Sequence, residues 1–238
     1  MKKAILSCIG LLCILIMTGC GPTLKDYVRQ SNNYSNQVKT TTNASVNIEE
    51  SGVVRGIGKL GTVGAIVNTA SNVATSALSN DQAARLNRLI EPQKVGASMA
   101  DGFNHNFEGT THLKVVGNDA NPDLRIMLTV TSYGLWAESL VSTMKFFVEA
   151  EIRVVYAPEM KTIYTNGATL SRDASNIISQ MANAVAGSGL NVLSLAKGAA
   201  NLAALFEMTD EEIVTIFDYL SYDSGLVIAT QLVDEIYR

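Results

Sequence analysis

The chain has 238 residues and a formal net charge of −4, and only 17% of its residues are charged. A mildly acidic sequence without a cluster of Lys and Arg is a poor candidate for binding nucleic acid or anionic lipid headgroups. The length suffices for one domain with helical additions.

The amino terminus has the pattern of a secretory signal peptide. Lys2 and Lys3 precede an apolar run, residues 4–17, that is too short for a membrane-spanning helix. The segment Met17-Thr18-Gly19-Cys20 resembles the lipobox of bacterial lipoproteins. That resemblance implies cleavage before Cys20 and acylation of its thiol, and Gly21 in place of Asp implies sorting to the outer membrane. We therefore expect a signal peptide over residues 1–19 and a lipid-anchored protein of the bacterial outer membrane.

The cysteines agree with an anchor. Cys8 and Cys13 lie inside the expected signal peptide, so the mature chain keeps only Cys20. A single cysteine allows neither a disulfide within the chain nor a cysteine-based metal site. We expect lipidation at Cys20 and no metal or cofactor.

The segment after the anchor, residues 20–50, is rich in Ser, Asn, Thr and Gln, which predicts a polar tether. Residues 51–238 are expected to form one α+β domain with helical N- and C-terminal parts. Two stretches, 60–80 and 174–196, are nearly free of charge and place small or apolar residues three and four apart. Such helices pack against a sheet, line a ring of subunits or contact lipid; packing on the sheet is favoured by their Asn, Ser and Thr residues.

The middle of the chain predicts an amphipathic helix over 93–107, followed by strands. The predicted strands alternate apolar and polar residues and read as one antiparallel meander. Their ranges are 112–116, 124–133, 144–156 and 161–170.

Two further helices are expected near the carboxyl end. Thr209 with Glu212 forms the capping-box pattern that opens a helix, and Ser224 is expected to cap the last one. The predicted fold class is thus α+β: a four-stranded antiparallel sheet packed with several amphipathic helices.

Several patterns suggest chemistry but lack its context. Residues 56–61 match the dinucleotide fingerprint by letter, yet no buried strand leads into them. His105 and His112, the only histidines, are seven residues apart, which is not a metal-ligand spacing on a helix. Glu149 and Glu151 share a strand face beside basic residues, which indicates a solvated face. We expect no catalytic site.

Trp136, with Leu135 and Leu140, falls in the predicted link between the second and third strands of the meander. These residues are a candidate protein interface. The alternative is a lid that closes the core.

The order of elements from 93 to 170 is similar to that of the curli-secretion lipoprotein and of periplasmic transport-auxiliary lipoproteins. The likeness rests on residues 122–131 (PDLRIMLTVT) and 164–168 (YTNGA). It implies a non-catalytic interaction or assembly subunit of the cell envelope that binds protein partners. The alternatives are a subunit of an oligomeric outer-membrane channel or exporter, which implies a homo-oligomer, and, third, an envelope hydrolase.

Overall fold

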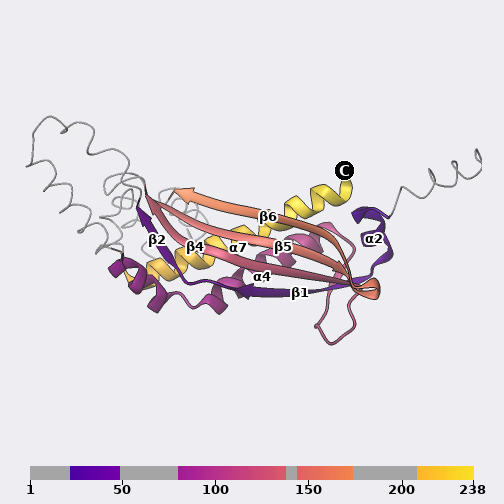
Figure 1. Ribbon diagram of the computed structural model, residues 1–238, viewed down its shortest axis with the longest axis horizontal. Helices are drawn as coiled ribbons and strands as arrows, with labels where there is room; N and C mark the ends of the chain where they lie inside the picture. The colour runs from indigo at the N-terminus through magenta and orange to yellow at the C-terminus, as the bar shows by residue number, and fades with distance from the viewer. Residues whose placement is uncertain (1–21, 49–79, 138–143, 174–207) are drawn as a thin grey trace, which may run out of the picture.

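The computed structural model describes residues 22–48, 80–137, 144–173 and 208–238. These residues form an α+β domain in which helices cover one face of a six-stranded mixed sheet (Figure 1). The helices are α2 (Leu24–Gln30), a helical segment at 80–89, α4 (Pro92–Thr110), the single 3-10 turn η1 (Ala157–Glu159) and α7 (Asp210–Tyr237). The strands are β1 (Asn33–Thr40), β2 (Ser45–Ile48), β3 (Lys114–Val115), β4 (Leu124–Ala137), β5 (Lys145–Tyr156) and β6 (Lys161–Asp173).

The sheet has the order β3-β1-β4-β5-β6, and β2 continues beside β4 where β1 ends. The antiparallel meander is confirmed for β4, β5 and β6. The expectation of four antiparallel strands is wrong, because β1 and β2 run parallel to β4 and β3 runs parallel to β1. The predicted strand 112–116 shrinks to the two residues of β3, at the edge of the sheet.

The polar tether expected over residues 20–50 is wrong for residues 24–48, which form α2, β1 and β2. The Thr23 side chain accepts a hydrogen bond from the Asp26 backbone N–H, and the Asp26 carboxylate accepts one from the Thr23 backbone N–H, so a capping box begins α2. In β1, Tyr34 is fully buried against the rings of Phe103 and Phe107. A strand with only one face on the core needs few apolar residues, which is why the polar sequence of β1 resembles a tether.

The core lies between the sheet and the helices α4 and α7, which run along the same face of the sheet (Figure 1). α4 packs on β1, whereas α7 packs on β5 and β6. Alternate residues of the central strands point into this layer because successive side chains of a strand face opposite ways. The fully buried ones in β4 include Leu124, Ile126, Leu128 and Val130.

α7 is one helix of 28 residues where two were expected. Its predicted capping box is present: the Thr209 side chain accepts from the Glu212 backbone, and the Glu212 side chain from that of Thr209. Ser224 does not cap a helix; it is buried inside α7, where its Oγ donates to the Leu220 carbonyl at 2.7 Å. In the described part of the chain, no helix combines the length and apolarity needed to cross a membrane.

Replacing Thr209 with alanine is expected to lower the free energy of unfolding by about 1 kcal/mol, because the first turn of α7 loses its cap. Thr209→Ser keeps the hydroxyl and should retain most of the stability. Urea denaturation of both variants measures the difference. Equal losses in the two variants would show that the hydroxyl is not what stabilises this end.

Candidate functional site

One edge of the sheet is open along β1. β3 pairs with β1 only at Asn33 and Tyr34, and no described strand lies beside the remaining residues of β1 on that side. An unpaired strand edge presents backbone donors and acceptors that another strand can use. The open stretch runs from Asn36 to Thr40.

The direction of the backbone groups in β1 follows from two hydrogen bonds. The Val116 N–H donates to the Tyr34 carbonyl at 2.8 Å, on the β3 side, and the Thr41 N–H donates to the Val130 carbonyl at 3.1 Å, on the β4 side. Because these directions alternate along a strand, the even-numbered residues of β1 face the open edge. The N–H and C=O groups of Asn36, Val38 and Thr40 therefore point away from β4, on the side where no described strand pairs with them.

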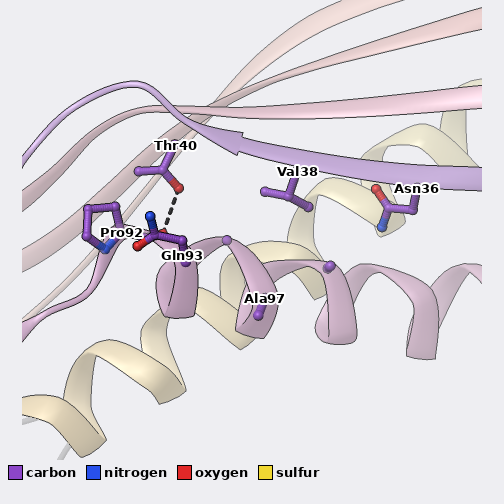
Figure 2. Close-up of a pocket in the computed structure, with 8 residues that line it drawn as sticks. Asn36, Val38, Thr40, Pro92, Gln93 and Ala97 are labelled. Carbon is purple, nitrogen blue, oxygen red and sulfur yellow. Dashed lines mark hydrogen bonds between the residues drawn. The ribbon is translucent and has the colours of Figure 1, made fainter. Parts of the chain in front are cut away.

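A groove of about 350 Å³ lies between this edge and the first turns of α4 (Figure 2). On the strand side, the Thr40 hydroxyl donates to the Pro92 carbonyl at 2.8 Å and fixes the start of the helix. The helix side is formed by small residues and by Gln93, and the lining has no charge. The lining residues are Asn36, Val38, Thr40, Pro92, Gln93, Gly96, Ala97 and Ala100.

Small side chains on α4 create this space. A Cβ added at Gly96 would lie 3.2 Å from Cγ1 of Val38 and 3.3 Å from Oγ1 of Thr40, so the helix approaches the strand closely here. The next residue, Ala97, is exposed and also lines the groove. A groove of this size with such a lining is suited to side chains of modest size.

Asn36 adds a polar group at one end of the groove. Its Nδ2 donates to Asn104 Oδ1 at 3.0 Å, and the Tyr34 hydroxyl donates to the same oxygen at 3.0 Å. Burial raises the pKa of Tyr34 well above its usual value, so this hydroxyl stays a donor at neutral pH. The Oδ1 of Asn36 is buried and has no hydrogen-bond partner among the described residues. It is an unused acceptor beside the open edge.

The open edge is closed at both ends. β3 covers one end at Tyr34. Beyond the other end, the Ala44 N–H donates to Asn87 Oδ1 at 2.7 Å, and Asn87 Nδ2 donates to the Ala44 carbonyl at 3.1 Å. This side-chain amide occupies the backbone groups of Ala44 as a neighbouring strand would.

Of the candidate interface at Trp136, Leu135 and Leu140, the structure describes Leu135 and Trp136, which point to opposite faces of the sheet. β4 extends to Ala137, so Trp136 lies in a strand and not in a link. Leu135 is buried in the core at 1% exposure, and its neighbour Trp136 points to the opposite face, where the Lys145 ammonium lies 5.1 Å from its ring centre. Leu140 lies outside the described residues.

The titratable residues considered from sequence lie apart. A ring nitrogen of His112 is 2.8 Å from the Ser31 carbonyl, whereas His105 lies beside the ring of Tyr222. Within the ranges that the structure describes, no group of three His, Cys, Asp or Glu side chains could hold a metal ion. The glycine pattern 56–61, both charge-poor stretches apart from Asn80, and Cys20 fall outside those ranges.

Sequence reasoning missed the groove. Its signals are weak: polar residues in β1, and the small residues Gly96, Ala97 and Ala100 in the first half of α4. Neither feature shows which strand lies beside which helix. The pairing of β1 with β4 and of α4 with β1 is what creates the site.

A comparison with models of protein families and with curated proteins finds no match. The solved structures that match include a Xanthomonas campestris protein of the family DUF330 (8% identity, 59% of this chain and 61% of that chain, TM-score 0.35). They also include the lipoprotein GNA1162 from Neisseria meningitidis (16%, 65% and 99%, TM-score 0.21) and the PelC dodecamer from Paraburkholderia phytofirmans (8%, 79% and 88%, TM-score 0.23). The chain spans less than two thirds of the Xanthomonas protein. No TM-score here reaches 0.5, so no property of these proteins is transferred.

Proposed function

We propose that this chain is a lipid-anchored, non-catalytic subunit of the bacterial outer membrane that binds another envelope protein by adding an extended segment of it to β1. The observation that carries the proposal is the row of outward backbone groups at Asn36, Val38 and Thr40 above an uncharged groove. Strand addition to an open sheet edge is a common mode of peptide recognition.

The edge of β1 and the groove beside it determine which kind of extended segment the partner must supply. Each backbone hydrogen bond to β1 contributes about 0.5–1.5 kcal/mol net, so affinity requires several of them together with side-chain burial. An added strand continues the pleat of the sheet, so every second side chain of the segment points towards α4 and into the groove. Since the lining has no charge, these alternate side chains should be small to medium and uncharged.

The location rests on the segment Met17-Thr18-Gly19-Cys20. Changing Cys20 to Ser is expected to release the protein from membranes and to abolish its labelling by radioactive palmitate, because two acyl-type anchors are needed for stable attachment. Membrane fractionation with and without the label measures both effects. If fractionation and labelling both stay unchanged, the lipid anchor is refuted.

The docking edge is tested by proline substitutions at neighbouring positions of β1. Val38→Pro removes an N–H that points outward and should weaken partner binding while β1 stays paired with β4. Lys39→Pro removes an N–H that faces β4 and should destabilise the fold by about 3 kcal/mol. The readout is a photo-crosslinking amino acid placed at Ala97 in the anchored protein, in native membranes, with urea denaturation for stability.

A crosslinked adduct with a second envelope protein is expected from position 97 and should decrease in the Val38→Pro background. A crosslinker at Lys94, which is exposed on the same helix but outside the groove lining, is the matched control and should give no such adduct. An adduct of twice the mass of the chain would mean that a second copy occupies the edge. Crosslinking without a gain in mass would mean that the chain fills its own groove, and either result overturns the proposal.

A further inference from the structure

Among the residues that the structure describes, the large exposed apolar side chains gather at one end. The large hydrophobic residues exposed in the described part of the chain are Val115 (40%), Met160 (68%) and Tyr237 (54%). They belong to β3, to the turn between β5 and β6, and to the end of α7. β3 pairs with the first residues of β1, which follow α2, and the β5–β6 turn contacts α2 through Lys161. The C-terminal end of α7 lies at the same end of the domain (Figure 1). Single exposed apolar residues are ordinary on a protein surface, but their restriction to one end is not.

The β5–β6 turn is held firmly against α2. The Lys161 ammonium donates to the Tyr27 hydroxyl at 2.8 Å and lies 5.2 Å from the centre of the Tyr27 ring. The same ring lies 4.8 Å from that of Tyr156, on the other arm of the hairpin. Because these contacts fix both arms, Met160 at the tip projects from a rigid support.

The chain leading to the anchor ends at this same place. α2 begins at Leu24, and Thr23 and Asp26 fix its first turn through their capping box. Cys20 is only four residues before Leu24, and four residues span at most about 14 Å when fully extended. A lipid attached to Cys20 would hold α2 within that distance of the membrane.

We propose that the end of the domain carrying Met160, Val115 and Tyr237 rests on the lipid bilayer that holds Cys20, with Met160 inserted among the headgroups. The inference rests on the lipid anchor of the proposed function. Lys114 directly precedes Val115, so its ammonium group reaches the headgroups while its stem lies along apolar surface. The Lys161 ammonium stays bound to Tyr27 and supports the tip from the side of α2. Contact of this kind comes from apolar insertion more than from net charge, since Glu159 flanks the same tip.

The mature chain permits an unambiguous label. With Cys20 acylated, a cysteine introduced by Met160→Cys is the single free thiol and takes one environment-sensitive fluorophore. The labelled, acylated protein is placed in vesicles of phosphatidylethanolamine and phosphatidylglycerol. We expect the emission maximum to shift to shorter wavelength relative to detergent, and a lipid carrying a spin label near its headgroup to quench the fluorescence.

Glu91→Cys supplies the matched control. Glu91 is exposed and immediately precedes Pro92, which contacts the far end of β1 at Thr40, so a fluorophore there should show neither the shift nor the quenching. The inference is overturned if the fluorophores at positions 160 and 91 behave alike in vesicles. Quenching at both positions means that the domain lies flat on the bilayer. Quenching at neither position means that the domain stands clear of the bilayer. Palmitate labelling of the same preparation reports separately on the anchor, so a failure of the proposed function is distinguished from a failure of this orientation.

Discussion

Replacing Gly102 with alanine is expected to lower the free energy of unfolding by about 3 kcal/mol or more, because the new methyl group has no space. Gly102 lies where α4 crosses α7, and a Cβ there would overlap the carbonyl oxygen of Tyr222. Gly225 faces the crossing from α7, and a Cβ there would overlap the carbonyl oxygen of Met99. The two backbones touch directly, so only a separation of the helices could admit a side chain. Urea denaturation measures the loss.

Gly109→Ala is the matched control within α4. No atom lies within 4 Å of a Cβ at Gly109, so this substitution should raise stability by about 0.5–1 kcal/mol through the better helix propensity of alanine. Gly225→Ala should reproduce the loss seen at Gly102, and the double variant should lose less than the sum because one separation relieves both overlaps. Similar stabilities for Gly102→Ala and Gly109→Ala would contradict the close crossing.

Replacing Gly134 with valine is expected to detach β2 from the sheet. Gly134 has a φ of 150°, a conformation that residues with a side chain rarely adopt, and a Cβ there would overlap the Ser45 carbonyl. Backbone strain and overlap together should cost about 3 kcal/mol. Denaturation measures this cost, and hydrogen exchange should become faster over residues 45–48.

Gly167→Val in β6 is the control for that substitution. Gly167 also lies in a strand, but no atom lies within 4 Å of a Cβ there and the residue is exposed. Its replacement should be neutral or stabilising, because valine favours the extended conformation. Unchanged exchange at residues 45–48 in Gly134→Val would refute the role assigned to this glycine.

The sequence was most informative where one face of an element is buried and the other is wet. β5 alternates cleanly because Val148, Ala150 and Ile152 face the helices while Glu149 and Glu151 do not. The capping box at the start of α7 was visible for a different reason: its two partners are three residues apart. Patterns confined to a short stretch of chain reveal both kinds of feature.

A change in which residues of β4 are buried explains why the predicted strand, 124–133, is shorter than the observed one, Leu124–Ala137. The register with β5 shifts between Val130 and Ser132, so the buried side chains change from even to odd numbers, and Tyr133 and Leu135 become core residues. The strict alternation therefore ends at Val130, and the last residues of the strand, from 134 on, resemble a link. Trp136 was placed in that link, although its position on the wet face follows from the shift.

The role of β1 depends on contacts between distant residues. The Asn32 N–H donates to Asp123 Oδ2 at 2.7 Å, and the Asp123 N–H donates to Asn33 Oδ1 at 2.9 Å, across about 90 positions of sequence. Its few apolar residues are enough for one covered face, and nothing local to the chain shows that β4 is its neighbour. The groove between β1 and α4 depends on the same long-range contacts, which is why no sequence pattern indicates it.

The amide of Asn87 gives the open edge a fixed length. It holds the N–H and C=O of Ala44, and β3 pairs with Tyr34 at the other end, so an incoming strand meets a stop on each side. Long unprotected edges let copies of a protein stack into fibrils. An edge bounded in this way limits the length of the segment that can pair with it. A short segment fits, whereas a growing stack of copies finds no continuous edge to extend.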